Sequence, residues 1–147
     1  MSQENVEVVQ RLFALVERCD SMSTEERLRQ YSEIYDLEVV IREAASLPYG
    51  GVYRGAQGVK QHALGFRQTW DPFQSGAERN LQPQVLDVGE YIVVLWRHKA
   101  AKPDGEKIEL PAVSVYKMRA GRIVESQMFH SDTAALLRFL SSHASKS

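Results

Sequence analysis

Two histidines and an aspartate near the ends of predicted strands are the side chains best placed to move protons. His98 ends the run YIVVLWRH, and His130 ends RIVESQMFH, with Asp132 two residues on. Side chains alternate across a strand, so His98 shares a face with Trp96, and His130 shares one with Met128. Imidazole changes charge near neutral pH. If both faces point inward, the two imidazoles and the Asp132 carboxylate meet in one pocket. The alternative is that one histidine is a hydrogen-bonded core residue and the other is solvated.

A second candidate acid, Glu43, lies on the strand predicted from LEVVIREAAS. It shares a face with Val39 and Ile41, where a carboxylate is costly to bury unless it is paired or protonated. A surface salt bridge is the alternative, because Arg42 is adjacent. His62 lies on the apolar face of a predicted helix, and we expect it to pack there.

Large apolar and aromatic residues are expected to form either the wall of a pocket or ordinary core. No HxH or HExxH spacing supports a metal site, and no nucleotide-binding loop is present, so neither metal nor cofactor is expected. The pocket-wall candidates are Phe66, Trp70, Phe73, Trp96, Met128 and Phe129.

The elements that position these residues follow from hydrophobic periodicity and turn signals. Apolar residues at three- and four-residue steps predict helices, and period-two runs separated by DVGE, KPDGEK and RAGR predict hairpin-connected strands. The dense glycine and proline of LPYGGVYRGAQG predict a loop. Asp132 is a helix N-cap candidate. We expect helices at about 4–19, 24–36 (with Thr24 as cap) and 56–70, strands at 37–46, 82–88, 91–100, 107–118 and 122–131, and a last helix after 132.

Composition narrows the class of protein. A chain of 147 residues with 44% apolar residues fits a single domain over 1–147. A formal net charge of −1 makes nucleic acid an improbable partner. The single cysteine excludes an internal disulfide. No apolar run is long enough to cross a membrane and no secretion signal is visible, so we expect a cytoplasmic protein.

The element order, the loop SLPYGGVYRGAQGV and the ending GRIVESQMFHSDTAALLRFL resemble the nuclear transport factor 2-like (NTF2-like) superfamily. Within it the chain is most similar to the SnoaL-like polyketide cyclases and the ketosteroid isomerase relatives. The resemblance implies an α+β fold: a curved antiparallel sheet forming a cone, with three helices on its concave face and a short C-terminal helix. One end of such a cone tends to keep a cavity. A homodimer formed through the outer face of the sheet is also implied.

The resemblance implies acid–base catalysis on an apolar or aromatic carbonyl compound, as a cyclase or isomerase that needs no cofactor. Asp132 matches the acid/base aspartate of SnoaL-like members, and Glu43 resembles in placement the proton-shuttling aspartate of the isomerases. The predicted catalytic set is therefore Glu43, His98, His130 and Asp132, and the predicted substrate-binding set is Tyr35, Phe66, Trp96, Tyr116 and Met128.

Departures from the family pattern leave alternatives open. The first helix has Phe13 where the isomerases place a tyrosine that donates to the oxyanion, so steroid isomerisation is disfavoured. The candidates to replace that donor are Tyr31, Tyr35 and Tyr116, and packing in the core with the hydroxyl at the rim is the alternative for each. An epoxide hydrolase of this fold uses an Asp–Arg–Asp set, but Arg97 has the opposite strand parity to Trp96 and His98. A ligand-binding or dimerisation module without catalytic activity is the main alternative.

Overall fold

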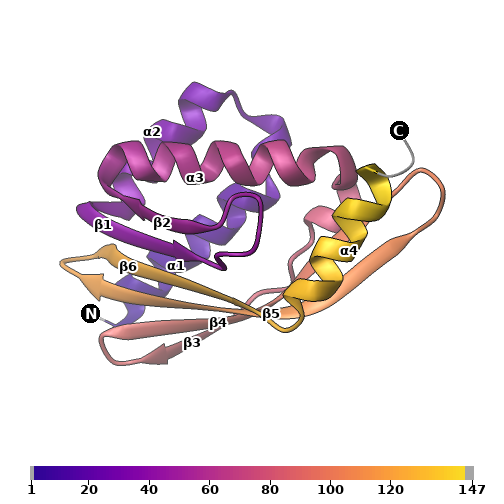
Figure 1. Cartoon of the computed structure of the whole chain (residues 1–147). Coiled ribbons are helices and arrows are strands. Elements are labelled where there is room, and N and C mark those ends of the chain that lie inside the picture. The colour runs from indigo at the N-terminus through magenta and orange to yellow at the C-terminus, as the bar shows by residue number, and fades with distance from the viewer. Residues whose placement is uncertain (1, 145–147) are drawn as a thin grey trace.

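The computed structural model describes residues 2–144. Three helices, one open six-stranded sheet and a C-terminal helix form an α+β domain (Figure 1). The helices are α1 (Ser2–Glu17), α2 (Thr24–Ile34), α3 (Gly55–Trp70) and α4 (Thr133–Ala144). The strands are β1 (Tyr35–Glu43), β2 (Gly51–Arg54), β3 (Gln84–Val88), β4 (Tyr91–Ala101), β5 (Lys107–Arg119) and β6 (Arg122–His130).

The sheet is mixed, where the sequence predicted an antiparallel one. Its order is β2-β1-β6-β5-β4-β3. β1 pairs with β6 in parallel, and all other neighbours are antiparallel. The glycine-rich segment predicted as a loop contains β2, which pairs with the end of β1 so that Glu43 lies opposite Gly51. This pairing fixes the backbone of β1 where it carries Glu43.

The helix boundaries agree with the periodicity to within a few residues. α2 begins one residue after its cap, and that cap is Ser23, not Thr24: the Ser23 side chain accepts a hydrogen bond from the backbone N–H of Glu26 (3.1 Å). α2 ends at Ile34 because the chain turns directly into β1 at Tyr35. In Figure 1, α3 lies across the sheet and α4 packs at its far end, beside the β4–β5 hairpin.

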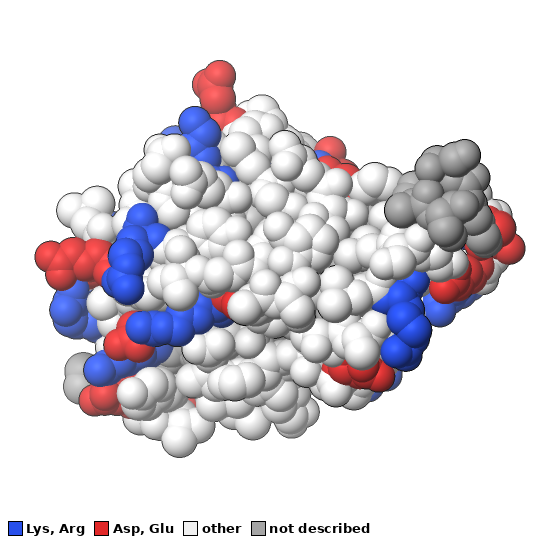
Figure 2. All heavy atoms as spheres, in the orientation of Figure 1, with Lys and Arg blue, Asp and Glu red and all other residues white. Residues whose placement is uncertain are grey.

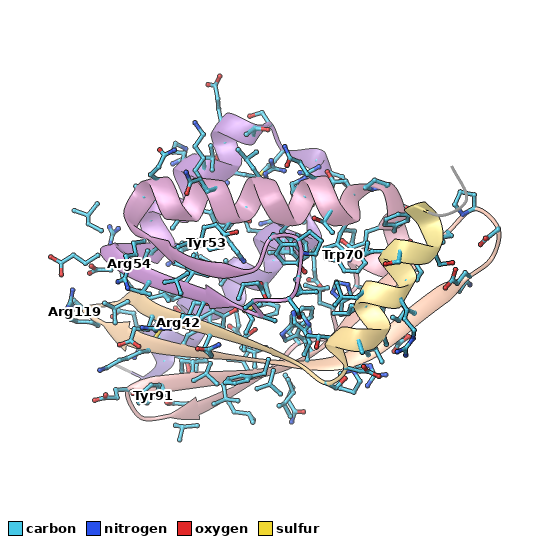
Figure 3. The ribbon with its side chains drawn as sticks, viewed as in Figure 1. Arg42, Tyr53, Arg54, Trp70, Tyr91 and Arg119 are labelled. Carbon is cyan, nitrogen blue, oxygen red and sulfur yellow. The ribbon has the colours of Figure 1, made fainter. Side chains whose placement is uncertain are left out.

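The core lies between the helices and the inward face of the sheet. Strand alternation sets that face, as predicted: Val94, Trp96 and His98 of β4 are all buried. A main cluster joins α1 and α2 to the sheet, and a smaller cluster joins the end of α3 to α4. Trp70 belongs to the second cluster and lies between α3 and α4 (Figure 3). Within the described residues, no helix is long and apolar enough to span a membrane.

The outward face of the sheet carries several exposed apolar side chains. Leu95, Val113 and Phe129 lie in one row across β4, β5 and β6, and Phe129 is 52% exposed. The prediction that Phe129 lines the pocket or core is therefore wrong, because it alternates with the inward-facing Met128. Arg97 also lies on the outward face, where it pairs with Glu109 (3.0 Å).

Candidate functional site

A buried carboxylate between two histidines is the main polar feature of the interior. The Glu43 side chain is only 1% exposed. Its Oε2 lies 3.0 Å from Nε2 of His62, and its Oε1 lies 3.2 Å from Nε2 of His130. The backbone N–H of Ala44 also donates to Oε1 (3.2 Å). Residues from β1, α3 and β6 thus meet at one carboxylate.

Charge and hydrogen bonding keep this carboxylate ionised. Burial by itself would raise the pKa of Glu43, but hydrogen bonds from His130 and His62, and their charges, outweigh it and lower the pKa to about 2. A carboxylate can only accept hydrogen bonds, so each imidazole presents its Nε2–H to Glu43. In the neutral ring, Nδ1 then carries the lone pair. The carboxylate therefore fixes the tautomer of both histidines.

Of the two histidines that contact Glu43, His62 is the one that lines the cavity. Its side chain is 17% exposed, against 2% for His130. Two aromatic rings hold the imidazole edge-on: Tyr53, with ring centroids 5.2 Å apart, and Tyr49, at 6.2 Å. Tyr53 is in turn fixed by its hydroxyl, which donates to the carbonyl oxygen of Tyr49 (2.9 Å); Figure 3 shows Tyr53 beneath α3.

The cavity of about 100 Å³ lies between α1, α2, α3 and the inward face of the sheet. Most of its wall is apolar or aromatic. The predicted substrate-binding residues all line it: Tyr35, Phe66, Trp96, Tyr116 and Met128. The cavity is also lined by Phe13, Tyr31, Val59, His62 and Ser126 near the sheet, and by Cys19, Arg67, Gln74 and Arg79 at the other end.

Hydroxyl groups in the wall can serve as neutral donors. Burial raises the pKa of Tyr116, so its phenol stays protonated. The pKa of Tyr31 rises to about 12, again chiefly through burial. Neutral phenols in an apolar wall can donate to an oxygen on which negative charge develops. The cavity thus combines an imidazole base with hydroxyl donors.

The opposite end of the cavity contains a saturated ion-pair network. The Arg79 guanidinium contacts Asp20 (3.1 Å), Asp71 (2.9 Å) and Oε1 of Gln74 (2.7 Å). Arg67 pairs with Asp71 at 2.7 Å. Cys19 lies beside them, and burial is the main cause of the rise in its thiol pKa, which leaves it a poor nucleophile. The charged groups of this network are paired with one another, and their side chains shape this end of the cavity.

His98 lies close to the carboxylate cluster but does not line the cavity. Its ring is 5.9 Å from that of His130 and 4.3 Å from that of Trp70, centroid to centroid. The side chain is fully buried, and neither ring nitrogen has a hydrogen-bond partner. Burial, followed by the charge of His130, lowers the pKa of His98 to about 3. The ring is therefore neutral at physiological pH.

Asp132 does not join the pocket in which the sequence placed it. β6 ends at His130, so strand parity no longer orients the residue two positions later. Asp132 is exposed, and its Oδ1 accepts a hydrogen bond from the backbone N–H of Ala135 (3.0 Å), which caps α4. His62, which the sequence assigned to packing, takes the place at the cavity wall.

No preformed metal centre is present: among residues 2–144, no group of three or more His, Cys, Asp or Glu side chains could hold a metal ion. The Glu43–His62–His130 cluster supplies one carboxylate and two imidazoles whose Nε2 atoms already face that carboxylate.

Comparison with solved structures identifies the fold. No protein-family model and no curated protein sequence matches this chain. The structure of TerC co-crystallized with polyporic acid has a TM-score of 0.74 at 16% identity, covering 94% of this chain and 98% of that one. An NTF2-like protein of unknown function from Burkholderia pseudomallei also has a TM-score of 0.74, at 21% identity, covering 93% and 97%.

A putative SnoaL-like polyketide cyclase from Jannaschia sp. has a TM-score of 0.62 at 18% identity, covering 91% of this chain and 90% of that chain. The NTF2-like α+β cone predicted from the sequence is thereby confirmed as the fold. Because this fold hosts unrelated chemistries, function must be argued from the site.

Proposed function

We propose that this protein binds a small, largely apolar carbonyl compound in its cavity and transfers a proton on it by acid–base catalysis. The observation that carries the proposal is the buried Glu43 carboxylate, 3.0 Å from Nε2 of the cavity-lining His62. A carboxylate behind an imidazole fixes the reactive tautomer and stabilises the imidazolium that forms when the ring takes a proton. His130 and the Ala44 N–H hold the other carboxylate oxygen.

In the proposed reaction, the lone pair on Nδ1 of His62 removes a proton from the carbon next to the substrate carbonyl. The C–H bond breaks, an N–H bond forms, and the electron pair moves to the carbonyl oxygen. A protonated hydroxyl in the wall, for which Tyr116 is the candidate, donates to that oxygen. Where the substrate is a β,γ-unsaturated ketone, the enolate is conjugated with the C=C bond, and return of the proton to the γ-carbon shifts that bond and gives an isomer. Attack of the enolate on a second carbonyl, followed by protonation of its oxygen, gives a cyclised product.

Relatives of the same fold support this class of ligand. One neighbour was crystallized with polyporic acid, and another is described as a putative SnoaL-like polyketide cyclase. The large apolar and aromatic share of the cavity wall favours a ligand with a ring or other hydrocarbon body. The carboxylate, imidazole and hydroxyl groups favour one with carbonyl oxygens.

The direct test is exchange of carbon-bound hydrogen. Cyclopentanone, which is small enough to need little rearrangement of the cavity, is incubated with the protein in D₂O, and loss of its α-protons is followed by NMR. We expect wild type to accelerate exchange and His62→Gln to lose at least about 100-fold of that acceleration, the contribution typical of a general base. Glu43→Gln should also lose rate, because an amide cannot stabilise the imidazolium.

Glu125→Gln is the matched control, because it makes the same change at a half-exposed carboxylate that pairs with Arg42. It should exchange like wild type. Circular dichroism confirms that each variant is folded. Wild type that does not exceed buffer alone, or His62→Gln that retains the wild-type rate, overturns the proposal.

A binding protein without catalytic activity is the second candidate function. It is favoured by the positions of His98, His130 and Asp132, none of which is among the residues that line the cavity. The two functions differ in one result: a ligand that binds in the cavity of wild type, with no exchange of its acidic protons, identifies a binder.

A further inference from the structure

A second hollow lies outside the cavity described above. It is a groove of about 270 Å³ between α2, the start of β1 and the first turns of α3. It occupies the end of the molecule where Arg54 and Arg119 are labelled in Figure 3. The residues that line it are Leu28, Tyr31, Ser32, Tyr35, Asp36, Leu37, Ala56, Gln57, Val59 and Lys60.

The groove and the cavity share part of their walls. Tyr31, Tyr35 and Val59 line both. The two tyrosine rings lie against each other, with centroids 6.0 Å apart and planes tilted by 46°. The partition between the two spaces therefore includes these two aromatic side chains.

The size of the cavity makes this connection relevant. At about 100 Å³ it is of the same order as an engineered cavity of about 150 Å³ that holds one benzene ring, so it has room for one small ring at most. Pockets for drug-sized ligands span roughly 300–1,000 Å³. Neither space reaches that range alone, but the two combined do. A ligand larger than a single small ring must therefore extend out of the cavity, and the groove is the neighbouring space that shares its wall.

The charges in the groove favour an anionic end on such a ligand. Asp36 is already paired with Arg119 (3.2 Å), which also approaches Glu38 (3.7 Å). Lys60 is exposed, and no ion pair of Lys60 occurs among residues 2–144. In the view of Figure 2, most of the charged side chains lie toward the ends of the molecule, and the middle of the surface is largely uncharged. The groove thus presents one ammonium group whose charge is not neutralised by a neighbouring carboxylate.

We propose that the groove is a second subsite, which holds the carboxylate-bearing tail of a ligand whose ring occupies the cavity. The ligand class is an elongated aromatic acid, with Lys60 contacting the carboxylate and Tyr31 and Tyr35 moving aside for the linking chain. This inference rests on the cavity of the proposed function and adds the shape and charge of the molecule that the cavity receives.

The test uses phenylalkanoic acids of increasing length, from phenylacetate to 8-phenyloctanoate, with binding measured by isothermal titration calorimetry. We expect the long acid to bind at least tenfold more tightly than phenylacetate. Lys60→Glu should weaken the binding of the long acid by about fivefold, which is the effect expected when an exposed attractive charge pair becomes a repulsive one. The same substitution should not change the affinity for the uncharged amide of the same length.

Lys107→Glu is the matched control, because it makes the same charge change at an exposed lysine on the β4–β5 hairpin, far from the groove. The subsite is overturned if all chain lengths bind equally, if no acid binds at millimolar concentration, or if Lys60→Glu affects the acid no more than Lys107→Glu does. Cyclopentanone exchange requires only the cavity. If the subsite fails its test while exchange is intact, the proposed function stands. If exchange is lost while binding of the tail is intact, the subsite stands and the proposed function falls.

Discussion

His98 should make the protein sensitive to acid, and replacing it should remove that sensitivity. The ring is fully buried without a hydrogen-bond partner, and its pKa falls from 6.5 to about 3 on folding. Between these two pKa values, His98 is therefore protonated in the unfolded chain and neutral in the folded chain. Stability is fully present above about pH 6.5 and is lost as the pH falls toward 3.

The magnitude follows from the size of the shift. At about 1.4 kcal/mol per pKa unit, the full shift corresponds to a loss on the order of 5 kcal/mol, of which ~3 kcal/mol is lost by pH ~4.5. His98→Leu has a similar volume and no titrating group. It also removes two buried polar atoms without partners, each of which costs about 1–3 kcal/mol. We expect the variant to be at least as stable as wild type at pH ~7.5.

Urea unfolding of both proteins at pH ~7.5 and ~4.5 measures the effect. The other acids titrate in both proteins, so the difference between the two pH dependences isolates His98. Wild type should lose ~3 kcal/mol more than His98→Leu. Equal losses, within ~0.5 kcal/mol, would refute the assignment of a neutral, unpartnered imidazole in the core.

Three further predictions concern other parts of the fold. Asp132→Ala should lower the free energy of unfolding by about 1 kcal/mol, because it removes the cap on the N–H of Ala135, whereas Asp132→Asn should keep it; thermal unfolding distinguishes the two. We propose that the outward face of the sheet pairs with a second copy of the chain: wild type should sediment as a dimer at micromolar concentration, and Phe129→Glu, on that face, should sediment as a monomer. Gly50→Ala should destabilise the fold by about 1–3 kcal/mol, since a Cβ there would lie 2.2 Å from the carbonyl oxygen of Ala44; an unchanged urea midpoint would contradict this.

The inward faces of the strands could be predicted from the sequence because alternation is local. Trp96 and His98 follow from the position of Val94. The same rule placed Glu43 beside Ile41 on β1, and the structure buries it there. Local periodicity is reliable wherever a strand is regular.

What the sequence could not predict depends on contacts between distant segments. The parallel pairing of β1 with β6 joins residues at least 85 positions apart, such as Val40 and Glu125, and no local signal encodes it. β2 is short and begins at Gly51 in a segment with strong turn signals, so only its pairing with β1 makes it a strand. Asp132 was misplaced because parity was extended beyond His130, where β6 ends.

His62 was missed because a helical stripe assigns a histidine to a face without naming its partner. The signal that could have found it was Glu43. An acid on an inward strand face requires cationic or hydrogen-bonding partners, and few side chains of that kind lie in the interior among residues 2–144. The periodicity placed His62 on the inward side of α3, but only the packing of α3 against β1 brings the two together.

The cost of burying Glu43 is the strongest argument that the cluster serves more than stability. Transferring a carboxylate out of water costs several kcal/mol even after relaxation, and well-packed apolar side chains often stabilise a core as well as a buried ion pair does. The arrangement instead produces an imidazole with a fixed tautomer at the wall of an apolar cavity, with His130 occupying the other carboxylate oxygen. A purely structural pair would have no need of a cavity beside it. The exchange rate of Glu43→Gln, more than its stability, therefore decides what this carboxylate does.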